Sequence, residues 1–166
     1  KGLILLGLGT LNDGFKEFEW RTKRPNFWPQ RRYKKPQWHG EPLTGKTLFV
    51  HWEQGFGDII QFSRYLPLIR HNLMEPPDRL IFDCPHKLQA LFADMCEVDE
   101  IGDFGDTPPY FDFYVPLMSL PIRLDTRMET IPVKIPYLTN LLDDHFKVSG
   151  GDDGRLQIGF VWASDH

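Results

Sequence analysis

The sequence has little cysteine and no long apolar run. Among 166 residues there are two cysteines, Cys84 and Cys96, and no C-x-x-C spacing. This usage is typical of a reducing compartment, with both thiols buried as small hydrophobic groups, although a disulfide stays open at this stage. No run of about 18 apolar residues occurs, so no membrane span is expected. The first residues lack a small-residue cleavage site, which disfavours a secretory signal. We therefore expect a cytoplasmic protein.

Several signatures of catalysis are also missing. The six histidines show neither H-x-x-x-H nor H-E-x-x-H spacing, and no D-x-D occurs. The spacings that usually hold zinc or other divalent cations are thus absent. No G-x-S-x-G elbow occurs, so a serine hydrolase has no support. We expect no metal site and no cofactor in this chain.

Glycine and proline are abundant, whereas the net charge is small. The chain has 14 of each, which predicts many turns and short elements. With 41% hydrophobic residues it can bury a core without disulfides or metals. Its formal net charge of −4 argues against a general nucleic-acid binder. The length corresponds to about one domain, and the absence of a starting Met favours a piece of a longer protein.

Positive charge is concentrated in residues 21–39. This stretch has no acidic residue and seven basic ones: Arg21, Lys23, Arg24, Arg31, Arg32, Lys34 and Lys35. The favoured interpretation is a solvated basic linker, and the alternative is a strip that faces an anion or a partner. Four aromatic residues are interleaved with the charges: Phe27, Trp28, Tyr33 and Trp38. We expect them to pin an extended connector to a domain surface, in preference to binding single-stranded nucleic acid.

The N-terminal residues 1–21 predict two short helices. Leu3–Leu8 is apolar on nearly all sides, as at the end of a buried helix. Leu11, Phe15 and Phe18 then fall on one helical face. A helical hairpin of this size cannot bury its apolar face alone, so it needs a neighbour.

From residue 47 the pattern becomes that of an α/β protein. Short apolar strands are expected at 47–52, 79–84, 98–101, 111–116 and 156–162, and helices at 59–73, 86–95 and 137–147. Pro67 should kink the first of these helices. Strands that alternate with helices predict a Rossmann-like parallel sheet with helices on both faces.

Two phosphate-binding patterns occur in unsuitable settings. Residues 40–47 match G-x-x-x-x-G-K-[ST], but they follow a proline-rich connector and open a strand, whereas a phosphate loop opens a helix. Gly55-Phe56-Gly57 resembles the start of a dinucleotide fingerprint, but Ile60 replaces the third glycine. Asp58 would lie where the pyrophosphate binds and would repel it. Both patterns therefore argue against a nucleotide cradle.

Asp58 is the most interesting single residue. It stands at the start of a helix, where a carboxylate commonly accepts hydrogen bonds from free backbone N–H groups. It also follows a buried strand, where an exposed carboxylate can take a proton from a substrate hydroxyl. On residue physics alone the cap is the commoner role, and the general base stays open.

A series of short blocks carries a family resemblance. In chain order they are Gly14–Arg21, Trp38–Leu43, Gly45–Leu48, Glu53–Asp58, Gln61–Pro67, Pro116–Pro121, Ile131–Pro132, Pro136–Leu138 and Ile158–Ala163. With these blocks in this order, the sequence resembles tetratricopeptide-repeat proteins that have a C-terminal glycosyltransferase-like domain. The resemblance implies a GT-B architecture, with two Rossmann-like lobes, related to lipopolysaccharide heptosyltransferases.

The resemblance also implies a division of the chain. Residues 1–23 would be the last part of a repeat, 24–46 a basic connector and 47–148 the first lobe. Residues 149–155 would be a linker and 156–166 the first strand of a truncated second lobe. In this family the second lobe holds most of the nucleotide-sugar donor, so we expect the chain alone to lack a donor site.

The functional residues follow from the same resemblance. A Gly-Asp pair after the first strand supplies the candidate base on the acceptor side, and Gly57-Asp58 matches it. We expect Asp58 to act on an acceptor hydroxyl and the Gln54 amide to orient it. Backbone N–H groups of Gly55, Phe56 and Gly57 would line the site, and Arg64 would contact an anion.

The expected partners are an acceptor glycan or protein, a protein bound through the repeat, and a second copy through the C-terminal strand. The alternative is a catalytically silent scaffold that combines a repeat with a Rossmann-like lobe. A free-standing nucleotide-binding domain is a third interpretation, which Asp58 and Ile60 disfavour.

Overall fold

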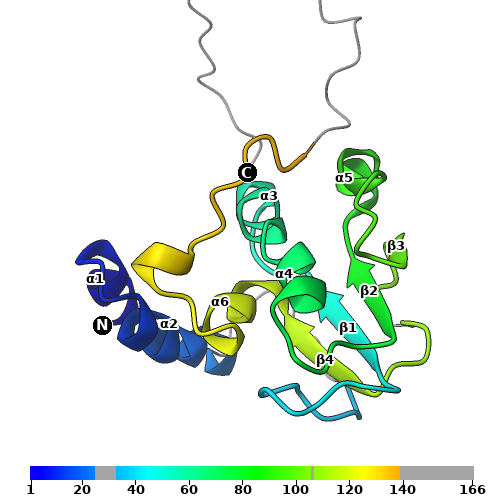
Figure 1. Cartoon of the computed structure of the whole chain (residues 1–166), viewed down its shortest axis with the longest axis horizontal. Coiled ribbons are helices and arrows are strands. Elements are labelled where there is room, and N and C mark those ends of the chain that lie inside the picture. Colours follow the sequence, from blue (N-terminus) through cyan, green and yellow to red (C-terminus); the bar gives the residue numbers. More distant parts are fainter. Residues whose placement is uncertain (25–32, 106, 139–166) are drawn as a thin grey trace, which may run out of the picture.

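The protein is built on a four-stranded parallel sheet (Figure 1). A computed structural model of the chain describes residues 1–24, 33–105 and 107–138. Its strands are β1 (Thr47–His51), β2 (Arg79–Asp83), β3 (Glu100–Gly102) and β4 (Phe113–Pro116), in the order β3-β2-β1-β4. All neighbouring strands are parallel. The fold is therefore α/β with a Rossmann-like sheet, as the alternating sequence pattern predicts.

Helices cover one face of this sheet. The first crossover contains α3 (Phe56–Ser63) and α4 (Leu66–His71), and the second contains α5 (His86–Phe92). Alternate strand residues point toward them, since side chains of a strand alternate between faces. The main core accordingly combines strand residues Leu48, Val50, Leu80, Phe82 and Val115 with Ile59, Leu66, Ile69 and Phe92 of the helices.

The opposite face has no described helix, which differs from the expectation of helices on both faces. The connection from β3 to β4 is a loop in its described residues, and its aromatic side chains cover the sheet instead. Phe111 stacks on Phe49 with ring centroids 5.0 Å apart, and Tyr33 of the connector meets Phe49 edge-on at 5.5 Å. Aromatic side chains each bury a large area, so these rings shield apolar residues on this face of the sheet.

The helix predicted over 59–73 is two helices. The chain leaves α3 at Ser63 and starts α4 at Leu66, and Pro67 occupies the first turn of α4. Proline is tolerated there because the first N–H groups of a helix have no intrahelical partner. Pro67 therefore starts a new helix, whereas the sequence pattern suggested a kink within one.

The N-terminal residues form a helical hairpin, as predicted. Its helices are α1 (Gly2–Gly7) and α2 (Leu11–Phe18), followed by the 3₁₀ helix η1 (Glu19–Lys23). The two helices approach closely at Gly14, where an added Cβ would come within 2.7 Å of Leu6 Cδ2. The expectation that α1 is buried is wrong: none of its residues is buried, and Leu3 and Ile4 are each 68% exposed.

The N-terminal helical hairpin packs against the α/β part of the chain. Helix α2 packs beside α6 (Leu120–Arg123), which follows the short 3₁₀ helix η2 (Leu117–Ser119) after β4. Another 3₁₀ helix, η3 (Met128–Thr130), follows α6. Asn12 of α2 donates a hydrogen bond to Asp125 at 2.7 Å. Helix α2 thus packs against α1 and also against the domain that follows it in the sequence.

The connector lies along the lobe. Trp38 is 1% exposed, and its indole N–H donates to the carbonyl of Glu41 at 2.8 Å. Its backbone N–H donates to the carbonyl of Tyr114 at 2.7 Å, so the connector adds a bridge to the edge of β4. The prediction that aromatics pin the connector is confirmed for Tyr33 and Trp38. Phe27 and Trp28 lie outside the described residues.

The structure also bears on the expectations for residues 40–47 and for the two cysteines. Strand β1 begins at Thr47, so residues 40–47 open a strand and not a helix. Both cysteines are free, but Cys96 is exposed, which corrects the expectation that both are buried. Burial raises the pKa of the Cys84 thiol to about 12, with a further contribution from the charge of Asp83. The predicted elements at 149–155 and 156–162, and all but the first two residues of the helix at 137–147, lie outside the described residues.

Within the described part of the chain, no helix combines the length and the apolar character needed to cross a bilayer.

Candidate functional site

The strand order identifies the edge of the sheet where a ligand is expected. From β1 the chain moves through β2 to β3, and it then returns to place β4 on the other side of β1. In open parallel sheets, ligands bind outside the carboxyl ends of the strands at such a reversal. The segments at this point follow β1 and β4, and they contain Glu53–Asp58 and Leu117–Ser119 respectively.

The turn after β1 has an unusual backbone. Gln54 has a φ of +66°, in the left-handed region that non-glycine residues seldom occupy. Gly55 then precedes α3, and its backbone N–H donates to Asp58 Oδ2 at 3.0 Å. Asp58 therefore does cap the helix. Strained backbone of this kind clusters at binding and catalytic sites, where the surrounding structure holds it in place.

The glycines of this turn leave its surface open. A Cβ added at Gly57 would meet nothing within 4 Å among the described residues, and one at Gly55 would meet only Asp58 Oδ2, at 3.5 Å. Neither glycine has a positive φ. Glycine in the first turn of a helix costs roughly 1 kcal/mol relative to alanine. Neither internal packing nor backbone geometry requires a glycine at position 57. A ligand that approaches the backbone closely would require one, because it would leave no room for a Cβ.

A cleft of about 650 Å³ lies between this turn and the helical hairpin. Gln54, Asp58, Phe62 and Met118 line it from the lobe. The hairpin side is mostly apolar and includes Leu3, Leu6, Phe15, Phe18 and Trp20, with the charged residues Lys1, Glu17, Arg21 and Arg24. The volume of the cleft is within the range of small-molecule and cofactor sites.

A buried ion network joins the hairpin to both turns. Arg21 is 5% exposed and donates to the carboxylate of Glu53, which is fully buried. The same guanidinium donates to Ser119 Oγ at 2.9 Å and to Glu19 Oε1 at 2.8 Å. Glu53 Oε1 also accepts from the backbone N–H of Met118 at 3.0 Å. Three distant parts of the chain therefore meet behind the cleft.

The outer part of this network involves Glu19. Its carboxylate accepts from Ser119 Oγ at 2.7 Å and from Arg123 at 2.9 Å. Burial raises the pKa of Glu53 above its ordinary value, and the Arg21 charge opposes this effect. A buried carboxylate of this kind needs its cation, because an unpaired charge in the interior is costly.

The basic stretch at 21–39 contains the residue that sequence reasoning misplaced. The favoured interpretation of this stretch as a solvated linker is wrong for Arg21, which is buried and ion-paired. An available signal was Glu53, an acidic residue two positions after a buried strand, which needs a partner of opposite charge if it is enclosed.

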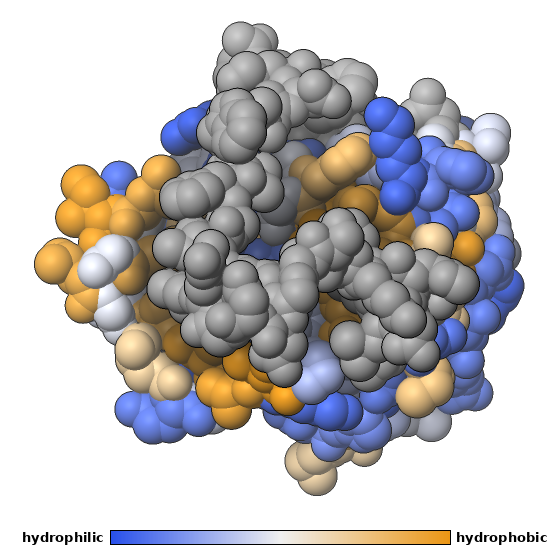
Figure 2. Space-filling view, turned by 90° about the horizontal axis from the view of Figure 1, so that it is seen from above, coloured by the Kyte–Doolittle hydropathy of each residue, from blue (hydrophilic) through white to orange (hydrophobic). Residues whose placement is uncertain are grey.

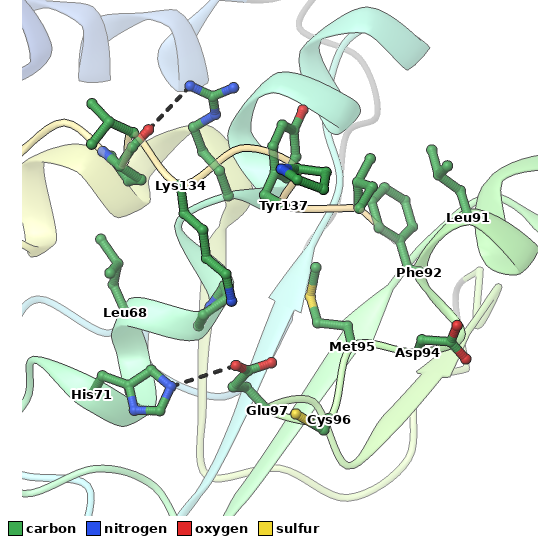
Figure 3. Close-up of a pocket in the computed structure, with 16 residues that line it drawn as sticks. Leu68, His71, Leu91, Phe92, Asp94, Met95, Cys96, Glu97, Lys134 and Tyr137 are labelled. Atoms are coloured by element: carbon green, nitrogen blue, oxygen red, sulfur yellow. Dashed lines mark hydrogen bonds and ion pairs between the residues drawn. The ribbon is translucent and has the colours of Figure 1, made fainter. Parts of the chain in front are cut away.

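Arg64 lies in a different place from the other expected site residues. Its guanidinium donates to the carbonyl of Pro132 at 3.2 Å and lies over the Tyr137 ring at 4.6 Å. It lines a second cavity, of about 390 Å³, between α4, α5 and residues 132–138. Figure 3 shows this cavity, with Leu68, Phe92 and Met95 on its apolar walls and the His71–Glu97 pair at one side. Arg64 is therefore not brought together with Asp58.

The other expected residues share one turn. Gln54 and Asp58 line the cleft, and Gly55 and Gly57 lie between them in the same turn. Phe56 is 45% exposed and is not among the cleft residues. No group of three or more histidine, cysteine, aspartate or glutamate side chains that could hold a metal ion occurs within the described ranges.

Comparison with known proteins gives one partial similarity. A stretch of 94 residues is 36% identical to Protein FlbA of Caulobacter vibrioides, and it covers 55% of this chain but 15% of FlbA. No protein-family model matches the chain. No solved structure matches it. The chain thus spans a small part of this much longer relative.

Proposed function

We propose that this chain is the acceptor side of a GT-B-type glycosyltransferase that works as part of a longer protein. The observation that carries the proposal is the position of Asp58, at the carboxyl edge of a parallel sheet, beside the point where strand order reverses and facing a cleft. The tetratricopeptide and heptosyltransferase resemblance supports the same assignment.

In the proposed reaction this lobe has two tasks, which are to orient the acceptor hydroxyl and to remove its proton. The acceptor oxygen forms a bond to the anomeric carbon of the donor sugar while the bond from that carbon to the phosphate oxygen breaks. The nucleoside diphosphate leaves with the electron pair, and the hydroxyl proton passes to the Asp58 carboxylate. The hydrogen bond from Gly55 N–H holds the carboxylate in one orientation. In this proposal a second lobe binds the donor.

The first test replaces Asp58 with asparagine in the full-length protein. The asparagine side chain keeps an oxygen for the Gly55 N–H but cannot take a proton, so transfer should fall at least about a hundredfold. The melting temperature should change little. The measurement is sugar transfer from a panel of nucleotide sugars, beside thermal unfolding of the same samples. Full transfer by D58N would refute the base role.

A second test uses Gly57→Ala. The added methyl meets nothing in the described structure, so the helix should become more stable, by up to about 1 kcal/mol. The same methyl stands where we place the acceptor, so KM for the acceptor should rise. Urea unfolding and initial rates measure the two effects. A variant that is both more stable and fully active would show that no ligand approaches Gly57.

One observation favours the alternative of a catalytically silent scaffold. Asp58 already serves as a helix cap through Oδ2, and a cap needs no further role. If D58N melts at a lower temperature and transfer is unchanged, the carboxylate is a cap alone. The lobe would then serve as a binding module.

A further inference from the structure

The buried carboxylate of Glu53 lies one residue before the strained position in the turn after β1. Glu53 is fully buried, and Gln54 follows it with a φ of +66°. The N–H of Gly55, the next residue, donates to Asp58 Oδ2 at 3.0 Å. A residue other than glycine keeps a left-handed backbone only where the surrounding structure holds it there. The Glu53 side chain is thus placed to hold the turn that carries Asp58.

The Glu53 carboxylate is anchored to two other parts of the chain. Its Oε1 accepts from the Met118 N–H at 3.0 Å, in the segment after β4, and from the guanidinium of Arg21 in the hairpin. The same guanidinium donates to Ser119 Oγ at 2.9 Å. Hydrogen bonds to an ionised group are stronger and more directional than neutral ones. One carboxylate oxygen therefore ties the turn after β1 to both the hairpin and the segment after β4.

The unpaired atoms of this network indicate that it serves more than stability. Glu53 Oε2 and Arg21 Nε are buried and have no hydrogen-bond partner among the described residues. A buried polar atom without a partner costs free energy, and apolar side chains in place of a buried ion pair are often at least as stable. A pair of this kind is best explained by the geometry that it imposes on its surroundings.

The hairpin contributes to this anchor, although its first helix lies outside the core. Leu3 and Ile4 of α1 are exposed, whereas Arg21 is buried. Figure 2 shows apolar side chains gathered at the left end of the molecule, where α1 lies in Figure 1. It is through Arg21 that the hairpin reaches the buried side of the turn after β1.

We propose that Glu53 and Arg21 are positioning residues, which act through the turn after β1 to hold the Asp58 carboxylate where it meets the acceptor hydroxyl. This inference rests on the proposed function, because it takes Asp58 as the base. Glu53 is fully buried and acts without touching the acceptor. A displacement of about 1 Å at the reacting groups can cost a hundredfold in rate, so the anchor of this turn matters for transfer. The helical hairpin is then a working part of the site in the lobe.

The test removes the pair without leaving a buried charge behind. Arg21→Met combined with Glu53→Leu replaces both charged side chains by apolar ones of similar size. In the full-length protein, kcat should fall at least about tenfold. The KM for the nucleotide sugar should stay within about twofold, since a second lobe binds the donor in the proposed function. Glu53→Gln keeps an oxygen for the Met118 N–H and for Arg21, so this conservative variant should retain most of the transfer.

Trp38→Ala is the control for lost stability. Trp38 is buried in the connector, where its indole N–H donates to the carbonyl of Glu41. Each variant is assayed well below its melting temperature, where Trp38→Ala should transfer sugar as the parent does. If the Arg21→Met, Glu53→Leu variant loses no more transfer than Trp38→Ala, the pair acts through stability alone and the positioning role is overturned.

A cycle with D58N shows whether the pair acts through Asp58. When Asp58 is already replaced by asparagine, the Arg21→Met, Glu53→Leu change should lower transfer by no more than about twofold, because the base that the pair positions is gone. Losses that multiply in the combined variant would show that the pair acts elsewhere, and they would overturn the proposal.

Hydrogen–deuterium exchange of the full-length protein gives a measurement that needs no transfer. With Arg21→Met and Glu53→Leu, the amides of residues 53–58 should exchange at least about tenfold faster than in the parent, while those of β2 keep the parent rate. Unchanged exchange at residues 53–58 overturns the positioning role. If this exchange rises as expected but the parent protein transfers no sugar from any nucleotide sugar, the anchoring of the turn is supported and the glycosyltransferase proposal fails.

Discussion

Arg21→Ala should lower the free energy of unfolding by about 3–5 kcal/mol, because it leaves a buried carboxylate without its cation. Glu53 is fully buried, and its Oε1 is held by Arg21 and by the Met118 N–H. Removal of the guanidinium also leaves Ser119 and Glu19 without one of their donors. Urea unfolding followed by tryptophan fluorescence measures the change.

The control for this prediction is another arginine pair. Arg127 and Asp125 are joined at 2.8 Å, but their side chains are 66% and 58% exposed. Exposed pairs contribute about 0–1 kcal/mol, so Arg127→Ala should have a small effect. A loss for Arg21→Ala no larger than for Arg127→Ala would contradict the structural role of the network.

The pH dependence of the same variant gives an independent check. Burial raises the pKa of Glu53, so the folded state holds this proton at pH values where the unfolded chain has lost it. Folding is then favoured at low pH, and this contribution is lost as pH rises through the folded-state pKa. Without Arg21 the pKa rises further, so the deficit of Arg21→Ala should shrink on acidification toward the unfolded-state pKa.

Trp38→Ala should cost about 3–5 kcal/mol of unfolding free energy, as truncations of buried aromatics do. Trp38 is 1% exposed and belongs to the main core, although it lies in a connector. Its loss opens a cavity beneath the edge of β4 and removes the indole hydrogen bond to Glu41. The matched variant is Trp20→Ala, which removes a side chain that is 63% exposed.

Trp20→Ala should change the unfolding free energy by no more than about 0.5 kcal/mol, as surface substitutions do. A comparison of the two tryptophan variants by urea unfolding therefore separates the effect of a buried tryptophan from that of an exposed one. If Trp38→Ala unfolds at the same urea concentration as the parent, the connector is not part of the folded core.

Local patterns predicted the sheet well, because buried parallel strands are short apolar runs in any context. The strands at 47–51 and 79–83 begin at the residues that the sequence pattern predicts. The helix break before Pro67 and the exposure of α1 were not predicted, since both depend on neighbours that periodicity does not describe. For the same reason, the sequence pattern suggested helices on both faces of the sheet, whereas aromatic side chains cover one of them.

The candidate site was predictable in part. The strand, the turn and the following helix placed Gln54 and Asp58 at one edge of the sheet, because the carboxyl ends of parallel strands share an edge. The side chain of Arg64 depended on contacts with residues about 70 positions away, with Pro132 as its partner. The Arg21–Glu53 pair joins residues 32 positions apart, and no local pattern links them.

The ion network also has a consequence for the order of folding. Glu19 is bound to residues 100 and 104 positions further along the chain, Ser119 and Arg123. Closing so long a loop is entropically costly and slow, so these contacts form after the local crossovers of the sheet. The cleft exists only once the N-terminal hairpin has met the turn after β1 and the segment after β4. A ligand that fills the cleft binds the native state alone. By mass action, such a ligand shifts the equilibrium away from states in which the hairpin is detached.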